Sequence, residues 1–193
     1  MPLLVPGENE KRLNSDYYTE GYATTFNEPY VLFSMDGIDY KEVVDRNALK
    51  DADMSDVLFQ YNHEGRVYAR TRMKQGLAPT LLMEPDEHGL FIAADLSKTT
   101  EAKKMFEDID SGLIYQMSWG FHVSEDSYNV ETHTRTILKV DKVYDVSAVD
   151  LPANPSTDIA SRWCGGVAEA EKLELVEREK KIKRIKILTT TEV

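Results

Sequence analysis

The sequence predicts a mainly β protein, with a mostly antiparallel sheet curled into a barrel and helices packed outside it. Short segments in which apolar and polar residues alternate recur along the chain, and turn signals separate them. Only one internal segment has a convincing helical period. Consecutive strand candidates follow one another too closely for the helical crossovers that parallel sheets need.

The first half of the chain is predicted to consist of strands and turns. Aromatic and threonine residues predict a strand from Tyr17 to about Phe26. Residues 30–44 suit two short strands joined at Asp36-Gly37, a hairpin signal. Residues 45–56 begin with an N-cap type aspartate and predict a short helix. Further strands are expected at 57–62, 66–73, 79–84 and 89–96.

The second half contains the one amphipathic helix, over residues 97–112, with an apolar stripe at helical spacing. The stripe consists of Ala102, Met105, Phe106 and Ile109. Strands are expected at 114–124 and 134–150, and a proline-rich segment ends the last one. We therefore predict a flexible arm at 1–15, a barrel domain at 16–163, and a hinge with a charged helical tail at 164–193.

Composition limits the classes of function. The formal net charge of −11 argues against general nucleic-acid binding, which needs a basic face. The single cysteine, Cys164, excludes an internal disulfide and suits a reducing compartment. No run approaches the length of a membrane span, and the start of the chain becomes polar too early for a signal peptide. We expect a soluble intracellular protein.

The segment 115–123, YQMSWGFHV, alternates with a period of two and therefore predicts a strand with two different faces. Its apolar face consists of Tyr115, Met117, Trp119, Phe121 and Val123. Ser118 stands on the polar face beside Gly120, and a glycine there leaves room for a second backbone or an acyl group. The alternative is a half-buried strand with an ordinary outward serine.

His63 ends an apolar strand and precedes a turn expected at Glu64-Gly65. The alternation places its side chain on the same face as Val57, Phe59 and Tyr61, at the edge of a buried surface. An imidazole there can be partly desolvated and still reach solvent, as a general base requires. A core-edge histidine with a structural hydrogen bond is the alternative.

Asp145 lies in the run 143–150, VYDVSAVD, which is otherwise apolar except for Ser147. A carboxylate is costly to bury unless a partner pairs with it, and a histidine N–H is suitable. An arginine or backbone N–H groups could also serve, and Asp141 and Asp150 are rivals for the role. Residues His88, His122 and His133 are scattered, so we expect no metal site and no cofactor.

Four stretches together resemble the prohead maturation proteases of tailed phages, from about Gly21 to Arg162. They are VLFQYNHEGRVYART at 57–71, GLFIAADL at 89–96, MSWGF at 117–121 and YDVSAVDLPANP at 144–155. That family is held to share the fold of the herpesvirus assembly protease. The resemblance therefore implies a closed antiparallel β-barrel of the herpesvirus-protease type with peripheral helices.

The resemblance implies a serine endopeptidase with Ser118 as nucleophile and His63 as base. The herpesvirus enzyme has a second histidine as third member, but no histidine follows His133 here, so Asp145 takes that place. Weaker candidates for oxyanion or substrate binding are Asn154, Gly120 and Arg66. Arg66 begins a run of basic residues that could dock an acidic scaffold or substrate segment or neutralise the oxyanion region; the alternative is a charged edge strand that resists aggregation.

The implied substrates are the major capsid protein, scaffold segments and the chain itself, whose tail is a candidate for removal. The implied location is the bacterial host cytoplasm inside assembling proheads, and a homo-oligomer is expected by analogy. No nucleic acid or membrane partner is expected. The alternatives are a catalytically silent capsid-assembly or scaffolding protein on the same barrel and, third, a small β-barrel esterase.

Overall fold

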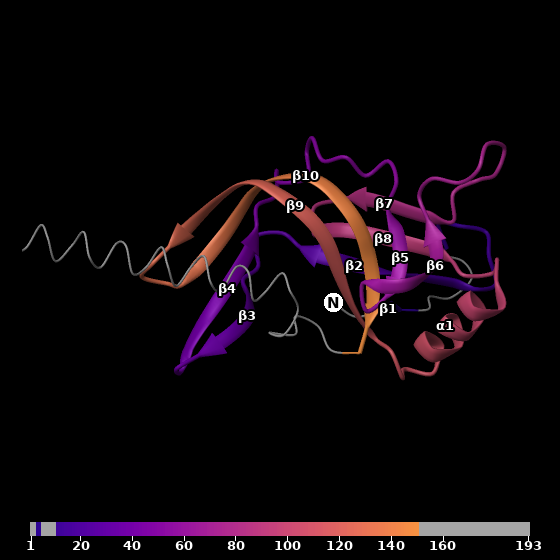
Figure 1. Ribbon diagram of the computed structural model, residues 1–193, viewed down its shortest axis with the longest axis horizontal. Helices are drawn as coiled ribbons and strands as arrows, with labels where there is room; N and C mark the ends of the chain where they lie inside the picture. The colour runs from indigo at the N-terminus through magenta and orange to yellow at the C-terminus, as the bar shows by residue number, and fades with distance from the viewer. Residues whose placement is uncertain (1–2, 5–10, 151–193) are drawn as a thin grey trace, which may run out of the picture. The chain divides into compact units, whose positions relative to one another are not determined.

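The computed structural model describes residues 3–4 and 11–150, which form ten strands and one helix (Figure 1). The strands are β1 (Leu3–Leu4), β2 (Tyr18–Thr25), β3 (Tyr30–Met35), β4 (Ile38–Val44), β5 (Leu58–Tyr61), β6 (Glu64–Arg70), β7 (Leu81–Pro85), β8 (Gly89–Asp95), β9 (Gln116–Asn129) and β10 (Thr134–Val149). The helix is α1 (Thr100–Asp110). The mainly β composition predicted from the sequence is confirmed.

The strands form two open sheets, so the expected closed barrel is wrong. One sheet has the order β1-β2-β8-β7, and the other has the order β3-β4-β10-β5-β6 with β9 also paired to β10. Most pairs are antiparallel, but β10 runs parallel to β4 and to β5. Alternation in a sequence shows which face of a strand is buried. It does not show whether the first and last strands of a sheet meet, and closure depends on that.

Strands β9 and β10 form a long bent ribbon that crosses the molecule (Figure 1). The first part of β10 pairs with β4 through residues 134–137, and the last part pairs with β5 through residues 145–148. Four register shifts interrupt the β9–β10 ladder, as expected where a strand bends. Strand β10 thus pairs with β9 on one side and, on the other, first with β4 and then with β5. This change of partner brings β5 beside the end of β10.

The register shift near the end of β10 is a β-bulge at Tyr144. Val143 lies opposite Phe121, whereas Asp145 lies opposite Gly120, so Tyr144 is one residue more than the partner strand supplies. Val143 and Val146 are both fully buried in the apolar core. Asp145 therefore lies on the face of the ribbon opposite to the core, which strict alternation from Val143 would not give.

The apolar core includes residues from both sheets and from α1. Phe59, Ile92 and Val146 are fully buried members of this one cluster, and Ala102, Met105 and Ile109 add the buried stripe of α1. The Thr99 side chain caps the helix by accepting a hydrogen bond from the Ala102 N–H at 3.1 Å. The helix predicted at 97–112 is confirmed with shorter ends.

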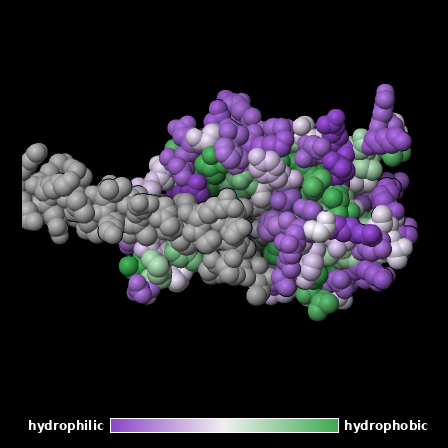
Figure 2. Space-filling model, viewed as in Figure 1, coloured by the Kyte–Doolittle hydropathy of each residue, from purple (hydrophilic) through white to green (hydrophobic). Residues whose placement is uncertain are grey.

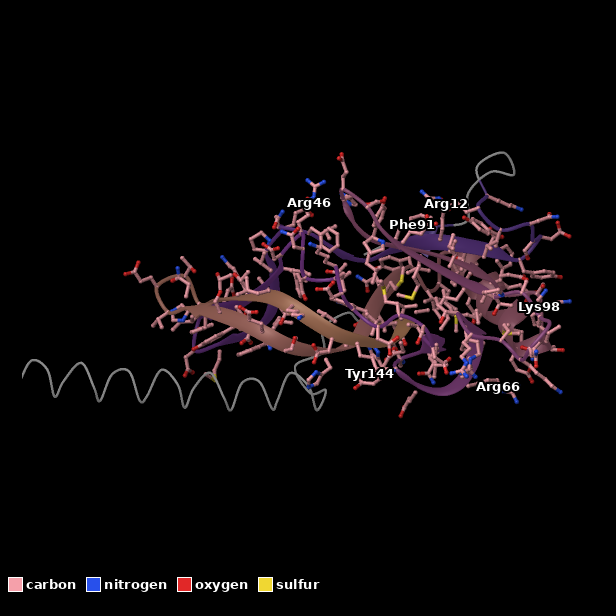
Figure 3. All side chains as sticks on the ribbon, turned by 90° about the horizontal axis from the view of Figure 1, so that it is seen from above. Arg12, Arg46, Arg66, Phe91, Lys98 and Tyr144 are labelled. Carbon is pink, nitrogen blue, oxygen red and sulfur yellow. The ribbon has the colours of Figure 1, made fainter. Side chains whose placement is uncertain are left out.

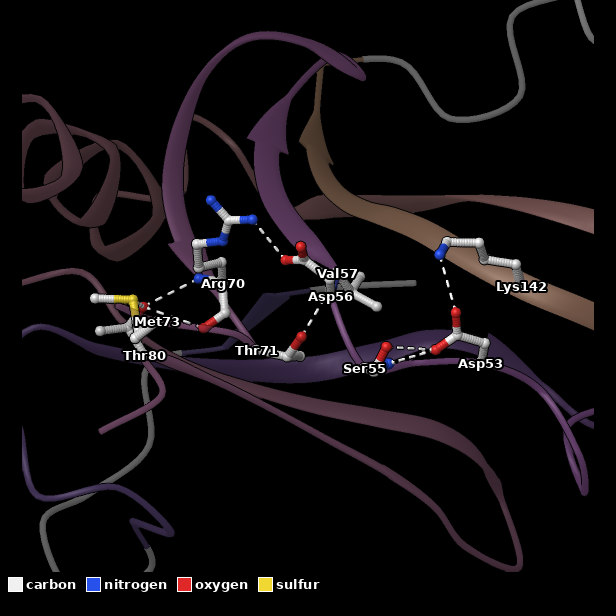
Figure 4. A network of polar contacts seen from close by, with 9 residues as sticks. All are labelled: Asp53, Ser55, Asp56, Val57, Arg70, Thr71, Met73, Thr80 and Lys142. Atoms are coloured by element: carbon white, nitrogen blue, oxygen red, sulfur yellow. Dashed lines mark hydrogen bonds and ion pairs between the residues drawn. The ribbon is translucent and has the colours of Figure 1, made fainter. Parts of the chain in front are cut away.

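Residues 45–56 form turns, so the short helix predicted there is wrong. Asp45 Oδ1 accepts the Asn47 N–H at 2.8 Å, and Asp53 Oδ1 accepts the Ser55 N–H at 2.9 Å. Short acidic side chains capture nearby backbone N–H groups in this way and compete with helix formation. Lys142 Nζ lies 2.9 Å from Asp53 Oδ2, which fixes the segment before β5 to β10 (Figure 4).

The surface of the described part is mainly polar. Hydrophilic side chains cover most of the face in Figure 2, with hydrophobic residues in small groups between them. Arg12 lies 4.1 Å above the centre of the Phe91 ring, so a cation covers an aromatic side chain of β8 (Figure 3). Among the described residues, no helix has the length and apolar character needed to cross a membrane.

The environment of Asp95, at the end of β8, predicts that the stability of the fold decreases measurably in acid. Burial raises the pKa of this carboxyl, but hydrogen bonds from Ser15, Ser97 and Lys98 outweigh that effect and hold the pKa below its ordinary value of 3.8. Its stabilising contribution is therefore complete above the unfolded pKa and is lost as the pH falls through the lower folded pKa.

Asp95→Asn is expected to lower the free energy of unfolding at pH 7 by about 1–3 kcal/mol, because hydrogen bonds to a charged group are lost. Urea unfolding at pH 7 and well below pH 3.8 measures the difference from wild type. The difference should shrink in acid. Asp51→Asn, on an exposed turn, is the control. A difference for Asp95→Asn that stays constant with pH would contradict the assignment.

Candidate active site

His63 lies in a tight two-residue turn between β5 and β6, not at the end of a strand. Tyr61 pairs with Glu64, and the two residues between them, Asn62 and His63, have φ values of 50° and 61°. Two left-handed residues in succession define a type I′ hairpin turn, two positions earlier than the turn expected at Glu64-Gly65. The turn ends the alternation of β5, so the imidazole leaves the core face that Phe59 occupies.

The imidazole of His63 lies against Asp145 of β10. The distance from His63 Nδ1 to Asp145 Oδ1 is 2.6 Å. The Asp145 side chain is 13% exposed and that of His63 is 32% exposed, so the pair joins a largely buried carboxylate to a ring that reaches solvent. Of the two rival carboxylates, Asp141 instead lies 3.3 Å from His122 Nδ1. The Asp150 backbone N–H lies 3.4 Å from Asn62 Oδ1.

Ser147 joins the same group of polar atoms. Its hydroxyl is fully buried and donates to Asp145 Oδ1 at 2.7 Å. It also accepts the backbone N–H of His63 at 3.2 Å. The sequence marked Ser147 as a polar exception in an apolar run, but no role for it followed from that pattern. A buried hydroxyl needs a partner, and this was the signal available in the sequence.

Ser118 lies on β9 directly opposite Ser147 of β10. Residues opposite each other in an antiparallel ladder project to the same face, with Cβ atoms about 4.5–5.5 Å apart. Ser118 is therefore on the face that carries Ser147 and Asp145, and it is half-buried. Its neighbours Met117 and Trp119 point into the core, as the alternation predicted. Tyr115, which precedes β9, is 55% exposed and does not belong to that apolar face.

Gly120 is required by the carboxylate of Asp145. A Cβ atom at position 120 would lie 2.2 Å from Asp145 Oδ2, far inside van der Waals contact. The open space that the sequence suggested for a substrate beside Gly120 thus contains the Asp145 side chain. The glycine lets β9 and the carboxylate approach closely.

Two arginines of the basic segment after His63 form ion pairs with neighbouring carboxylates. Arg66 NH1 lies 2.7 Å from Glu101 of α1, and Figure 3 shows Arg66 at the periphery. Arg70 lies 2.6 Å from Asp56 (Figure 4). Strand β6 ends at Arg70, so the later basic residues do not continue its face. Asn154 lies outside the described residues.

A cleft of about 440 Å³ lies beside the turn, and its lining includes Tyr61, Tyr68, Asp108, Ile114 and Asp150. Within the described part of the chain, no group of three or more histidine, cysteine or acidic side chains could hold a metal ion.

The strain in the turn gives a testable result for Asn62. Asparagine tolerates a left-handed backbone better than β-branched residues do, so Asn62→Val is expected to cost about 1–2 kcal/mol of stability. The sequence predicts His63 as a general base, so peptide-cleavage activity should also fall, by roughly tenfold or more. Urea unfolding and peptide-cleavage kinetics measure the two effects.

Asp36→Val is the matched control for Asn62→Val. Asp36 also occupies the first position of a two-residue hairpin turn, with φ 52°, but it joins β3 to β4. It should lose similar stability and retain activity. Equal loss of activity in both variants would show that the position of the Asn62 turn has no special importance for catalysis.

A mainly β chain that places a histidine–aspartate pair on the same face as a strand serine has the parts of a serine hydrolase. Comparison with known families gives a more specific result. The family model of caudovirus prohead serine proteases matches residues 7–177, and the chain belongs to this family. No curated protein and no solved structure matches the chain.

Proposed function

We propose that this chain is an endopeptidase of phage prohead maturation that uses Ser118 as nucleophile, His63 as general base and Asp145 as the carboxylate that orients His63. Membership of the prohead serine protease family supports the reaction class. The observation that carries the assignment of residues is the 2.6 Å contact of His63 Nδ1 with Asp145, on the face of the β9–β10 ribbon that Ser118 shares.

The proposed mechanism is acyl transfer. Asp145 accepts the Nδ1–H of His63, which leaves Nε2 as the ring nitrogen that can take a proton. His63 removes the proton of Ser118 as the hydroxyl oxygen attacks a peptide carbonyl, and the imidazolium then protonates the leaving amine. Water attacks the resulting ester with His63 again as base, and this releases the acid product.

The position of Ser118 in its sheet suits a peptide substrate. Among the described strands, β9 pairs only with β10, so its other edge can accept hydrogen bonds from an added strand. An extended peptide that binds such an edge brings successive backbone carbonyls past a side chain on the edge strand. The scissile carbonyl can thereby reach Ser118 without the peptide entering the apolar core.

We infer that the chain acts as a homo-oligomer inside the assembling prohead. Its substrates there are the major capsid protein, scaffold segments and its own C-terminal region. The family name supports action on proheads. The finer assignment rests on the charged segment after Gly165-Gly166, which offers a region where cleavage would leave the catalytic strands intact.

A serine-directed fluorophosphonate tests the nucleophile. The wild-type chain, purified alone and from particles formed with the major capsid protein of the same phage, is treated with the reagent, digested and mapped by peptide mass. The adduct is expected on the peptide that contains Ser118, and Ser127 on the same strand is the internal control. No adduct in either preparation, with both folded, would favour a catalytically silent assembly protein. An adduct on another serine would show that this other serine, and not Ser118, is the nucleophile.

A further inference from the structure

We propose that Ser147 is a positioning residue of the active site, which holds His63 in place through its backbone and through Asp145 at once. No role for Ser147 follows from the mechanism above, in which Ser118, His63 and Asp145 perform all proton transfers. The kinetic part of this inference rests on the proposed function. The structural part concerns the resting protein and can be tested without a substrate.

The hydrogen-bond directions around Ser147 follow from the groups involved. A backbone N–H can only donate, so the Ser147 hydroxyl oxygen accepts from His63 N at 3.2 Å. A carboxylate can only accept, so the hydroxyl proton goes to Asp145 Oδ1 at 2.7 Å. Asp145 Oδ1 in turn lies 2.6 Å from His63 Nδ1. The three contacts form a closed ring that begins and ends on His63.

This ring explains how a strained histidine keeps one orientation. His63 has a φ of 61°, a conformation that non-glycine residues adopt at a cost. Ser147 fixes its main chain and Asp145 fixes its ring, so backbone and side chain are restrained from the same strand. Because Nδ1 faces Asp145, the opposite ring nitrogen Nε2 is turned away from this carboxylate.

The place of Ser147 in the sheet links this restraint to the nucleophile. Ser147 is the register partner of Ser118 on β9 and of Gln60 on β5. It is fully buried, so its two hydrogen bonds are protected from competition with water. The hydroxyl that anchors the base is therefore one strand away from the hydroxyl that the base deprotonates.

The test compares Ser147→Ala with Ser147→Thr, which keeps a hydroxyl. For Ser147→Ala, kcat for a cleaved peptide is expected to fall roughly 10–100-fold, because misplacement of the base by about 1 Å has effects of this size. KM should change little, because Ser147 does not reach the substrate. Ser147→Thr should recover most of kcat. Ser147→Cys, of similar volume but with a weak donor, takes the place of Ser147→Ala if that variant does not fold.

Proton NMR of the resting protein supplies the readout that does not need activity. The Nδ1 proton shared by His63 and Asp145 should give a strongly downfield signal in wild type and Ser147→Thr, and the signal should broaden or disappear in Ser147→Ala. Thr80→Val removes another buried hydroxyl, one that accepts the Arg70 N–H at 3.0 Å. It should lower stability and leave both the signal and kcat unchanged.

The two proposals fail in different ways. If Ser147→Ala keeps the downfield signal and a kcat within twofold of wild type, Ser147 has no positioning role, whatever the nucleophile is. If wild type cleaves nothing and no serine is labelled, the proposed function fails. The signal then still decides whether Ser147 positions His63.

Discussion

Ser118→Ala is expected to reduce peptide cleavage by roughly 10³-fold or more and to leave the fold intact, because it removes the proposed attacking oxygen and nothing that the core needs. Ser118 is half-buried on the face of β9 away from Met117 and Trp119, so loss of its hydroxyl leaves core packing unchanged. Stability should therefore stay within about 0.5 kcal/mol of wild type, as for other substitutions away from buried features.

Two measurements check the Ser118→Ala result. Co-expression with the major capsid protein of the same phage shows whether that protein is cut, and the intact mass of the purified chain shows whether the chain cuts itself. Cleavage present in wild type should be absent in Ser118→Ala. Ser127→Ala, the same change on an exposed position of the same strand, should behave as wild type. Cleavage that persists in Ser118→Ala would eliminate Ser118 as the nucleophile.

Gly120→Ala should damage the site and the fold together, although it adds a single methyl group. The new Cβ atom would lie 2.2 Å from Asp145 Oδ2, so either the carboxylate must rotate or β9 must move away from β10. Added volume in a packed site costs about 1–3 kcal/mol of stability. A rotated Asp145 would also lose His63 Nδ1, and a roughly 10²-fold fall in kcat is expected from a misplaced base.

A double-mutant cycle with Asp145→Ala separates the steric effect from a general effect of alanine at position 120. Without the carboxylate the clash disappears, so Gly120→Ala should cost less stability in the Asp145→Ala background than in wild type. The expected coupling is about 0.5–3 kcal/mol, measured by urea unfolding of the four proteins. Equal costs in both backgrounds would mean that Asp145 is not what Gly120 accommodates.

Local signals along the chain predicted the strands well, since each depends on a few neighbouring residues. Asp36-Gly37 predicted the β3–β4 hairpin because both positions have positive φ, which aspartate and glycine tolerate. The same signal was available at Asn62, but the glycine at position 65 indicated a later turn. The helix expected from Asp45 failed because an N-cap residue also starts turns.

The long-range features could not be predicted from these local patterns. Closure of a barrel depends on contacts between strands that are far apart in sequence, and the two sheets are open. The partner of His63 had three candidates in the sequence, and only the parallel pairing of β5 with the end of β10 selects Asp145. The proposed role of Ser147 depends on its hydrogen bond with the His63 backbone N–H, and the sequence gives no sign that these two residues meet.

The extra residue at position 144 changes which alternate residues of β10 face the core. Every odd-numbered side chain from Asp145 to Val149 lies on the face that Ser118 uses, whereas Val143, also odd, belongs to the interior. If Tyr144 instead took a regular place in the ladder, strict alternation from Val143 would exchange the two sets and turn the Asp145 carboxylate toward the core. The aspartate alone is therefore not sufficient for the site, because the irregular backbone at position 144 decides which face of β10 presents it.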